Sequence, residues 1–371
     1  MTNKKKDSNS KLGLPTVSTS EVVNILTKIY VGAIRSGMPL TTIPTPFLWG
    51  QPGVGKSAGM YELADNIEKQ TGRRTHVIDI RLALFSPVDL RGVPYADKDG
   101  LRTVWLKPAI FDMDDTEDVI NILFLDELSA APQSVQVGAY QLTLDRKVGE
   151  HHLPENCIVV AAGNRTTDQS VSFKMPKALA NRMMHFEICS DFGSWKCWAK
   201  ENRIDERIID YLFFVHEDLS VEPETTEVAF PTPRSWTFVS DLLKVTGAEP
   251  AELAQAISGA VGYTAAIDFI EFCKEYRDFP SMEGICCGIE KSYPASNDVL
   301  YRLTETLIDT VCYDEDLTAG HIRNIFQYVG RFPLDFIRVF VEGLNRNDYV
   351  QRRVSRISGY RELLEKTGPK E

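Results

Sequence analysis

Gly50-Gln51-Pro52-Gly53-Val54-Gly55-Lys56-Ser57 fits the pattern G-x-x-x-x-G-K-[ST]. The apolar run over 46–49 that precedes it predicts a buried strand, and a helical pattern begins near Ser57. A strand, a glycine-rich loop and a helix in this order are the context of a phosphate-binding loop, or P-loop. Glycines allow the backbone N–H groups to converge on phosphate oxygens, and the positive end of the helix dipole adds to the attraction. The motif therefore predicts a site for the phosphates of a nucleotide.

The P-loop residues have distinct expected roles. The Lys56 ammonium would reach the β- and γ-phosphates of ATP, and the Ser57 hydroxyl would bind Mg²⁺. The residues expected to contact the nucleotide are Gly50, Gln51, Pro52, Gly53, Val54, Gly55, Lys56, Ser57 and Ala58. The pattern thus predicts ATP and Mg²⁺ as cofactors.

An acidic pair follows a second apolar run. Residues 122–125 are apolar and lead directly into Asp126 and Glu127, which is the Walker B pattern. Asp126 would hold Mg²⁺, mostly through water. Glu127 is placed to polarise an attacking water as a general base. A kinase of small molecules needs no glutamate at this position, so the pair favours ATP hydrolysis.

An asparagine ends a further apolar run, which covers 157–162 and continues as Gly163-Asn164-Arg165. At the tip of a strand that lies beside the P-loop strand, the Asn164 amide would lie near the γ-phosphate and could orient the attacking water. An asparagine after a glycine is also typical of an ordinary turn. The P-loop and the acidic pair elsewhere in the chain favour the functional interpretation.

Length, charge and composition exclude several classes of protein. Its 371 residues predict two or three domains, and its net charge of −11 argues against a bulk electrostatic binder of nucleic acid. No apolar run approaches the roughly 18 residues of a membrane span, and no apolar segment follows Lys4–Lys6 as a signal peptide requires. The seven cysteines include no C-x-x-C pair, so neither a zinc site nor a disulfide framework is expected. We expect a cytoplasmic protein with no membrane partner.

Apolar runs and helical patterns alternate through the first half of the chain. Strands are expected at 46–49, 75–80, 119–125, 157–162 and 185–189. Such alternation predicts an α/β domain with a parallel five-stranded sheet, and from Asp191 onward the patterns are mostly helical. The expected division is a disordered segment over 1–15, an α/β nucleotide-binding domain over 16–190, an α-helical lid domain over 191–277 and a C-terminal helical extension over 278–371.

The order of these motifs resembles that of AAA+ ATPases. The residues within and around the motifs resemble those of the MoxR family, which is related to the dynein-type AAA modules. The resemblance covers about residues 20–275. The segments that carry it are Asp126–Ser129 (DELS), Leu142–Gly149 (LTLDRKVG), Ala161–Arg165 (AAGNR), Met175–Phe186 (MPKALANRMMHF) and Pro233–Trp236 (PRSW). The resemblance implies a P-loop AAA+ core followed by an all-α lid, with hydrolysis of ATP to ADP and phosphate.

Three arginines receive roles from this resemblance. Arg182 falls where the arginine finger of a neighbouring subunit is expected, which would stabilise transition-state charge in trans, a contribution on the order of 10³–10⁵ in rate. A finger supplied in trans requires a ring oligomer, expected to be a hexamer. The family more often has Asp-Arg-Phe where this chain has Asn181-Arg182-Met183. Arg234 matches the second sensor, which touches the γ-phosphate in cis, and Arg146 resembles an interface arginine.

Two hairpins are expected as insertions in the α/β domain. The first joins 90–95 to 103–106 around Asp97–Gly100, and the second surrounds Gly149 and Glu150. In the family both hairpins point toward a central pore. Because aromatic residues are favoured interface anchors, Tyr95 and Trp105 suggest that the first hairpin engages a client or partner rather than the nucleotide.

The resemblance implies chaperone-like remodelling of a protein client. MoxR-like proteins commonly work with a partner that carries a von Willebrand factor A domain. One alternative is a nucleic-acid-directed AAA+ motor, which the acidic charge counts against. Another is an ATP-gated scaffold that hydrolyses poorly, which Glu127 and Arg182 count against. Stimulation of ATP turnover by DNA, by RNA or by a partner protein would distinguish these functions.

Overall fold

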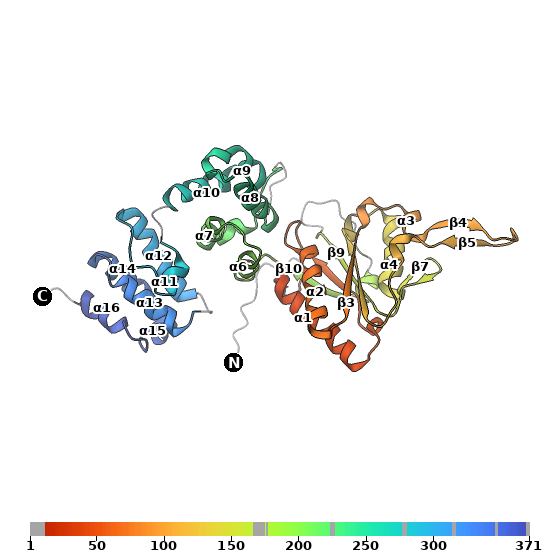
Figure 1. The fold of residues 1–371 in the computed structure, drawn as a ribbon, viewed down its shortest axis with the longest axis horizontal. Coiled ribbons are helices and arrows are strands. Elements are labelled where there is room, and N and C mark those ends of the chain that lie inside the picture. Colours follow the sequence, from red (N-terminus) through yellow and green to blue (C-terminus); the bar gives the residue numbers. More distant parts are fainter. Residues whose placement is uncertain are drawn as a thin grey trace. The chain divides into compact units, whose positions relative to one another are not determined.

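A computed structural model describes residues 12–165, 175, 177–222, 227–276, 280–313, 317–345 and 348–368. It divides into two compact units (Figure 1). The first unit comprises the described residues up to Ala248 together with Gln255–Ala265, and the second comprises Glu249–Ala254 with the described residues from Ala266 onward. The division predicted from the sequence, with boundaries after residues 190 and 277, stays a prediction.

A parallel sheet of six strands forms the centre of the first unit, in the order β1-β10-β2-β9-β6-β3. Its strands are β1 (Thr16–Val17), β2 (Pro46–Trp49), β3 (Arg74–Arg81), β6 (Val119–Asp126), β9 (Cys157–Gly163) and β10 (Met184–Ile188). The α/β fold with a parallel sheet is confirmed, but the predicted number of five strands is wrong. The additional strand, β1, has two residues, which is too short for a periodic pattern, and it pairs with β10 at the sheet edge.

Helices cover both faces of this sheet. The helices of the α/β part are α1 (Thr19–Ser36), α2 (Lys56–Thr71), α3 (Pro87–Arg91), α4 (Gln133–Asp145) and α5 (Lys177–Ala180). Phe124 of β6 packs in one core with α1 and α2, whereas the next residue, Leu125, packs in another core with α4. Because β6 is buried on both faces, residues 122–125 form a continuous apolar run rather than an alternating one.

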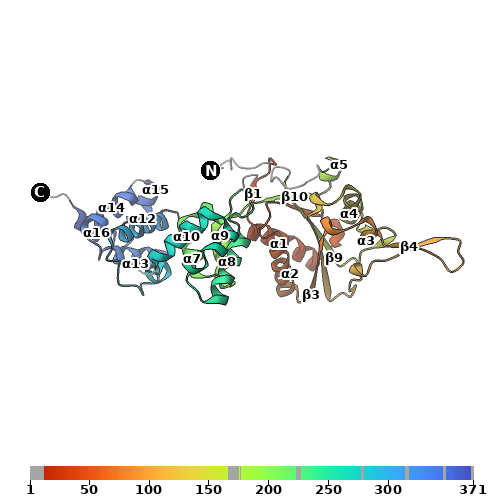
Figure 2. The ribbon, with the colours of Figure 1, turned by 90° about the horizontal axis from the view of Figure 1, so that it is seen from above.

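Two antiparallel hairpins extend the α/β part, as predicted. β4 (Val93–Ala96) pairs with β5 (Thr103–Leu106), and β7 (Lys147–Val148) pairs with β8 (His151–His152). The β4–β5 hairpin projects away from the sheet (Figure 2). Gly92 begins it with φ 86°, and a Cβ atom there would lie 1.8 Å from the Leu106 carbonyl oxygen, so only glycine fits.

A helical part completes the first unit. It contains α6 (Phe192–Glu201), α7 (Glu206–Phe214), α8 (Pro233–Thr246) and α9 (Ala254–Val261), the last of which begins at the boundary of the unit. Trp236 lies at its centre, fully buried, with its ring 5.4 Å from Tyr211 and its indole N–H donating to the Asp218 carbonyl oxygen over 2.6 Å. This contact holds α8 against α7 and the segment after it.

The second unit is all-helical. After α10 (Tyr263–Tyr276), which crosses the boundary between the units, it contains α11 (Met282–Cys286), α12 (Asn297–Tyr313), α13 (Ala319–Val329), α14 (Leu334–Asn345), α15 (Asp348–Val354) and α16 (Tyr360–Thr367). Leu303, Phe326 and Phe340 belong to its apolar core. None of the helices in the described part of the chain has both the length and the apolar character needed to cross a bilayer. The cytoplasmic location stays a prediction.

Candidate nucleotide-binding site

The P-loop joins β2 to α2, as the sequence predicted. Gly53 and Gly55 have φ of 83° and 93°, which are backbone conformations that residues with a Cβ rarely adopt. Gly53 also lies against the helical part, because a Cβ atom there would lie 2.9 Å from the hydroxyl oxygen of Thr232. Thr232 caps the N-terminus of α8. Gly53 is therefore required both by the left-handed backbone of the loop and by the close approach of α8.

Lys56 is buried inside the curl of the loop. Its Nζ donates to the carbonyl oxygens of Gly50 over 2.7 Å and of Gln51 over 2.9 Å. It also donates to Oδ1 of Asn164 over 3.3 Å. The lysine ammonium and the asparagine amide, 108 residues apart in sequence, thus meet at the mouth of the P-loop.

The carboxyl end of β6 brings the acidic pair to the first turn of α2. The Ser57 hydroxyl donates to Oδ2 of Asp126 over 3.1 Å, and Oδ1 of Asp126 accepts from the Glu127 backbone N–H over 2.8 Å. Glu127 has φ 56°, a left-handed conformation that costs a non-glycine residue roughly 1–2 kcal/mol. The chain therefore turns sharply at the residue proposed from sequence as the general base.

Asn164 follows the last residue of β9. Its backbone carbonyl accepts a hydrogen bond from the Ser129 hydroxyl over 3.0 Å, which ties the tip of β9 to the turn after the acidic pair. A Cβ atom on Gly163 would lie 2.7 Å from that same hydroxyl oxygen. The glycine before Asn164 is thus required by close packing, and the predicted placement of this strand tip beside the P-loop is observed.

Asp79 of β3 is a site residue that the sequence analysis missed. Burial raises the pKa of its carboxyl, and the negative charges of Asp126 and Glu127 raise it further, against an opposing effect of Arg81. Asp79 therefore lies in the negative field of the acidic pair. An aspartate near the carboxyl end of the strand expected over 75–80 was the available signal, because neighbouring parallel strands end at the same edge of the sheet.

The residues at this edge fit a magnesium ion. A hydroxyl and a carboxylate lie 3.1 Å apart at Ser57 and Asp126, and oxygen atoms of these types are the ligands that Mg²⁺ takes in proteins. Asp79 lies close enough to Asp126 and Glu127 that their charges, after burial, raise the pKa of its carboxyl. A divalent cation would offset the repulsion among these three carboxylates.

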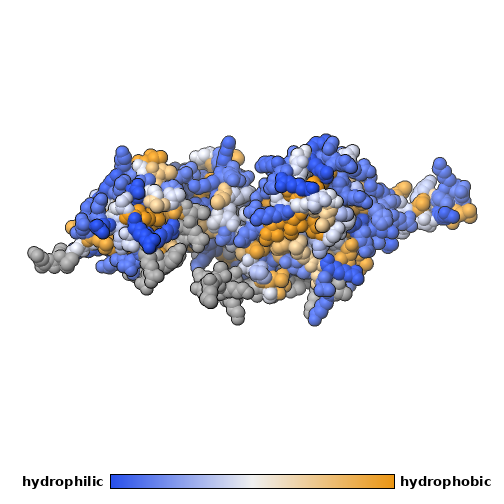
Figure 3. All heavy atoms as spheres, turned by 90° about the horizontal axis from the view of Figure 1, so that it is seen from below, coloured by the Kyte–Doolittle hydropathy of each residue, from blue (hydrophilic) through white to orange (hydrophobic). Residues whose placement is uncertain are grey.

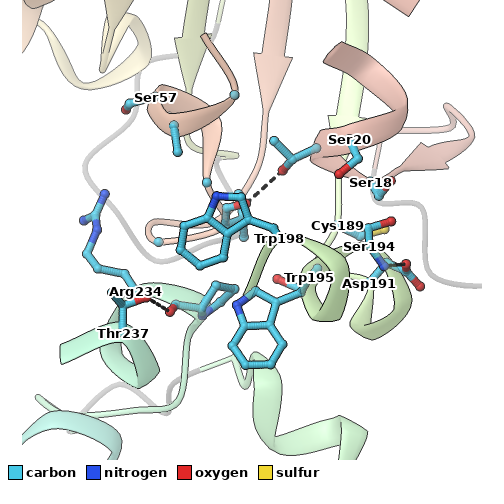
Figure 4. A pocket seen from close by; sticks show the side chains of 18 of the residues that line it. Ser18, Ser20, Ser57, Cys189, Asp191, Ser194, Trp195, Trp198, Arg234 and Thr237 are labelled. Carbon is cyan, nitrogen blue, oxygen red and sulfur yellow. Dashed lines mark hydrogen bonds between the residues drawn. The ribbon is translucent and has the colours of Figure 1, made fainter. Parts of the chain in front are cut away.

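A cavity of about 240 Å³ adjoins the P-loop inside the first unit (Figure 4). It lies between the start of α1, the P-loop with the start of α2, and helices α6 and α8. Its lining includes Ser18, Thr19, Ser20, Gly53, Val54, Gly55, Ser57, Ala58, Glu62, Asp191, Ser194, Trp195, Trp198, Arg234, Thr237 and Phe238. The Thr19 hydroxyl donates to the Val54 carbonyl over 2.9 Å, which fixes the start of α1 against the loop.

Two features of this cavity bear on the sequence predictions. Arg234, the second residue of α8, lines it, and its contact with the nucleotide in cis stays a prediction. Trp198 of α6 lies in the middle of the view, with Ser57 and Arg234 on one side and Ser18 and Ser194 on the other (Figure 4). The sequence analysis missed this tryptophan, because only the packing of α6 against the P-loop brings it to the cavity.

Arg182 does not line the cavity. It is exposed, in the turn between α5 and β10.

The interface role expected for Arg146 is wrong. Arg146 is buried, and its Nη2 donates to the Ile43 carbonyl oxygen over 3.2 Å. Its Nη1 has no hydrogen-bond partner among the described residues. The residue ends α4 with φ 53°, and this turn directs the guanidinium into the protein rather than toward a neighbouring chain.

A buried ion pair beside the site was also missed. Arg165 directly follows Asn164, and its Nη1 lies 3.0 Å from Oε1 of Glu187, a fully buried residue of β10. Its Nη2 lies 3.6 Å from Glu222. Breaking such a pair leaves an uncompensated buried charge, so it fixes the segment that carries Asn164.

Comparison with known proteins finds similarity among solved structures only. No protein-family model matches the chain, and no curated protein resembles it. Among solved structures, a mutant of RuvB from Thermotoga maritima is 13% identical, with a TM-score of 0.34 over 96% of this chain and 92% of that one. NtrX from Brucella abortus in complex with ADP is 14% identical, with a TM-score of 0.37 over 96% and 70%. PCH-2 from C. elegans is 14% identical, with a TM-score of 0.36 over 70% and 69%. Similarity at this level carries no argument about function, which rests on the site itself.

Proposed function

We propose that the chain is an ATP-hydrolysing AAA+ ATPase of the MoxR-like type. One observation carries the proposal: Lys56, Ser57, Asp126 and Asn164, from three separate segments, are joined by hydrogen bonds at one end of the sheet. Ordinary turns at these three strand ends would have no reason to bring a lysine, a hydroxyl, a carboxylate and an amide together. Binding and hydrolysis of a nucleoside triphosphate requires this set.

Lys56 would hold the β- and γ-phosphates. The carbonyl oxygens of Gly50 and Gln51 now accept from its ammonium, and phosphate oxygens are stronger acceptors for an ammonium because they carry negative charge. Ser57 and Asp126 would hold Mg²⁺, which neutralises charge on the phosphates when bound. The start of α2 adds backbone N–H groups aimed at the same position.

Glu127 would act as the general base. A water oxygen attacks the γ-phosphorus, its proton passes to the Glu127 carboxylate, and the bond to the β–γ bridging oxygen breaks to give ADP and phosphate. The Asn164 amide, which already lies 3.3 Å from Lys56 Nζ, would orient that water. Arg234 would contact the γ-phosphate from α8.

The cavity beside the P-loop would take the nucleoside. It borders the P-loop at Gly53–Ser57 and extends to α6, so a ligand whose phosphates lie in the loop would place its base near Trp198. Aromatic side chains stack on bases. Trp198 would therefore cover one face of the base.

The exposed Arg182 supports assembly into a ring. Its exposed side chain is available to a neighbouring subunit, and its proposed action is on the γ-phosphate bound there. A head-to-tail contact of this kind closes into a ring when the rotation permits. A hexamer is the proposed form.

We propose a protein client or a partner with a von Willebrand factor A domain as the target of the β4–β5 hairpin. Val93 is 54%, Tyr95 62% and Leu106 56% exposed, and apolar atoms are visible along the hairpin at the right of the molecule (Figure 3). Trp105 is only partly exposed, because the Arg91 guanidinium lies 5.2 Å from its ring. An exposed apolar hairpin favours a protein surface as its target over a nucleic acid.

Binding of Mg·ATP to wild-type protein and to Lys56→Ala tests the proposal. Wild type should bind and Lys56→Ala should lose measurable binding with little effect on folding, because the ammonium faces the loop rather than an apolar core. Lys69→Ala, an exposed lysine on the same helix, is the matched control and should bind as wild type does. Equal ATP affinity in Lys56→Ala and wild type would remove the assignment.

A further inference from the structure

A hydrogen-bonded link joins the P-loop strand to the turn that carries Arg182. The indole N–H of Trp49, the last residue of β2, donates to Nδ1 of His185 on β10 over 3.0 Å. Nε2 of His185 lies 2.8 Å from the carbonyl oxygen of Ala180, the last residue of α5. The Trp49 and His185 rings are also stacked, with an interplanar angle of 26°.

The partners fix the tautomer of His185. A tryptophan N–H can only donate, so Nδ1 must present a lone pair. Nε2 must then carry the proton and donate to the Ala180 carbonyl, which can only accept. Both ring nitrogens are therefore committed, and the imidazole adds a side-chain link from Trp49 to Ala180 to the backbone pairing of β2 with β10.

Each end of this link adjoins a proposed catalytic element. Trp49 directly precedes Gly50, whose carbonyl oxygen accepts from Lys56. The Ala180 carbonyl also accepts from the backbone N–H of Met183 over 3.2 Å, which closes the turn that contains Arg182. A shift of Lys56 from the loop carbonyls to phosphates would alter the position of Gly50, and through Trp49 and His185 the position of this turn.

We propose that His185 is a positioning residue that couples nucleotide occupancy of the P-loop to the placement of Arg182. The nucleotide bound in one subunit would then determine how Arg182 of that subunit is placed in the active site of its neighbour. This inference rests on the proposed function, because it requires Arg182 to act in trans. It adds a direction of communication, from the P-loop of one subunit to the active site of the next.

Mixed assemblies test the coupling. Arg182→Ala subunits, which keep their own P-loop, are mixed with donors that supply Arg182 but cannot hydrolyse ATP. One donor is Glu127→Gln, which holds ATP, and the other is Lys56→Ala, which is empty. Turnover then comes only from Arg182→Ala subunits beside a donor. We expect the ATP-bound donor to support at least about threefold faster turnover than the empty one.

Cutting the link in the donor should abolish that difference. Trp49→Phe keeps an aromatic ring but loses the N–H together with the five-membered ring, and His185→Asn keeps an acceptor near Nδ1 but loses the donor at the Nε2 position that reaches Ala180. When either substitution is added to both donors, the two donors should support equal turnover. The ATP affinity of the Glu127→Gln donor should stay within about twofold of its value without the added substitution. His76→Asn, an exposed histidine on β3, is the control and should keep the threefold difference.

The outcomes separate the inference from the proposed function. Equal turnover with the two unmodified donors, or a threefold difference that survives Trp49→Phe and His185→Asn, would overturn the coupling while leaving trans action intact. No turnover with any donor would overturn the trans action itself.

Hydrogen exchange at residues 181–183 gives a second readout in the wild-type chain. ATP should change the protection of these backbone amides, and Trp49→Phe should remove that change.

Discussion

The Ser57 hydroxyl lies 3.1 Å from the Asp126 carboxylate, although 69 residues separate them in sequence. The contact exists because α2 starts directly after the P-loop strand while β6 ends two strands away, with β9 between them. The same order brings Asn164, at the tip of β9, to Lys56. The chemistry of the site is thus a consequence of strand order.

Trp198→Ala should weaken ATP binding about tenfold, because stacking on a base contributes roughly 1–3 kcal/mol. Trp198→Phe should retain most of the affinity. Inorganic triphosphate, which has no base, should bind both variants as it binds wild type. Titration calorimetry measures all three. If Trp198→Ala binds ATP as wild type does, the base lies elsewhere.

Arg182→Ala should retain ATP binding and lose at least tenfold in turnover, since a finger contributes to the transition state rather than to the ground state. Mixing Arg182→Ala with Lys56→Ala subunits should restore some hydrolysis across shared interfaces. Arg356→Ala, an exposed arginine of the second unit, serves as the control. Absence of rescue, together with a monomer at saturating ATP, would exclude the trans mechanism.

Replacing residues 97–100 with Gly-Ser and Trp105 with Ala should leave basal turnover within about threefold of wild type while removing stimulation by a client or partner. The β4–β5 hairpin stands apart from the P-loop, so its loss should not reach the nucleotide. Tyr95→Ser with Leu106→Ser tests the exposed apolar side chains without disturbing the contact between Arg91 and Trp105. A collapse of basal hydrolysis would instead make the hairpin part of the fold or of the ring interface.

The parts of the site that lie in short, continuous segments of the chain were predicted from the sequence. The P-loop, the acidic pair and the Asn164 strand tip each follow an apolar run, and a parallel sheet necessarily gathers such ends at one edge. Asp79 was missed because its role depends on which strand lies beside β6. Trp198 was missed because it reaches the cavity only through the packing of α6. Arg146 was misassigned because a left-handed turn after α4, which no periodic pattern reveals, points its side chain inward.

ATP binding and turnover by Glu127→Gln, measured beside wild type, test the central claim most directly. The substitution keeps the shape of the side chain and removes the charge that accepts the proton of the attacking water, while Asp126 and Ser57 remain in place for Mg²⁺. We expect ATP affinity within about twofold of wild type and turnover at least tenfold slower. Unaltered turnover in Glu127→Gln, with ATP bound, would contradict the assignment of this site as one that hydrolyses ATP.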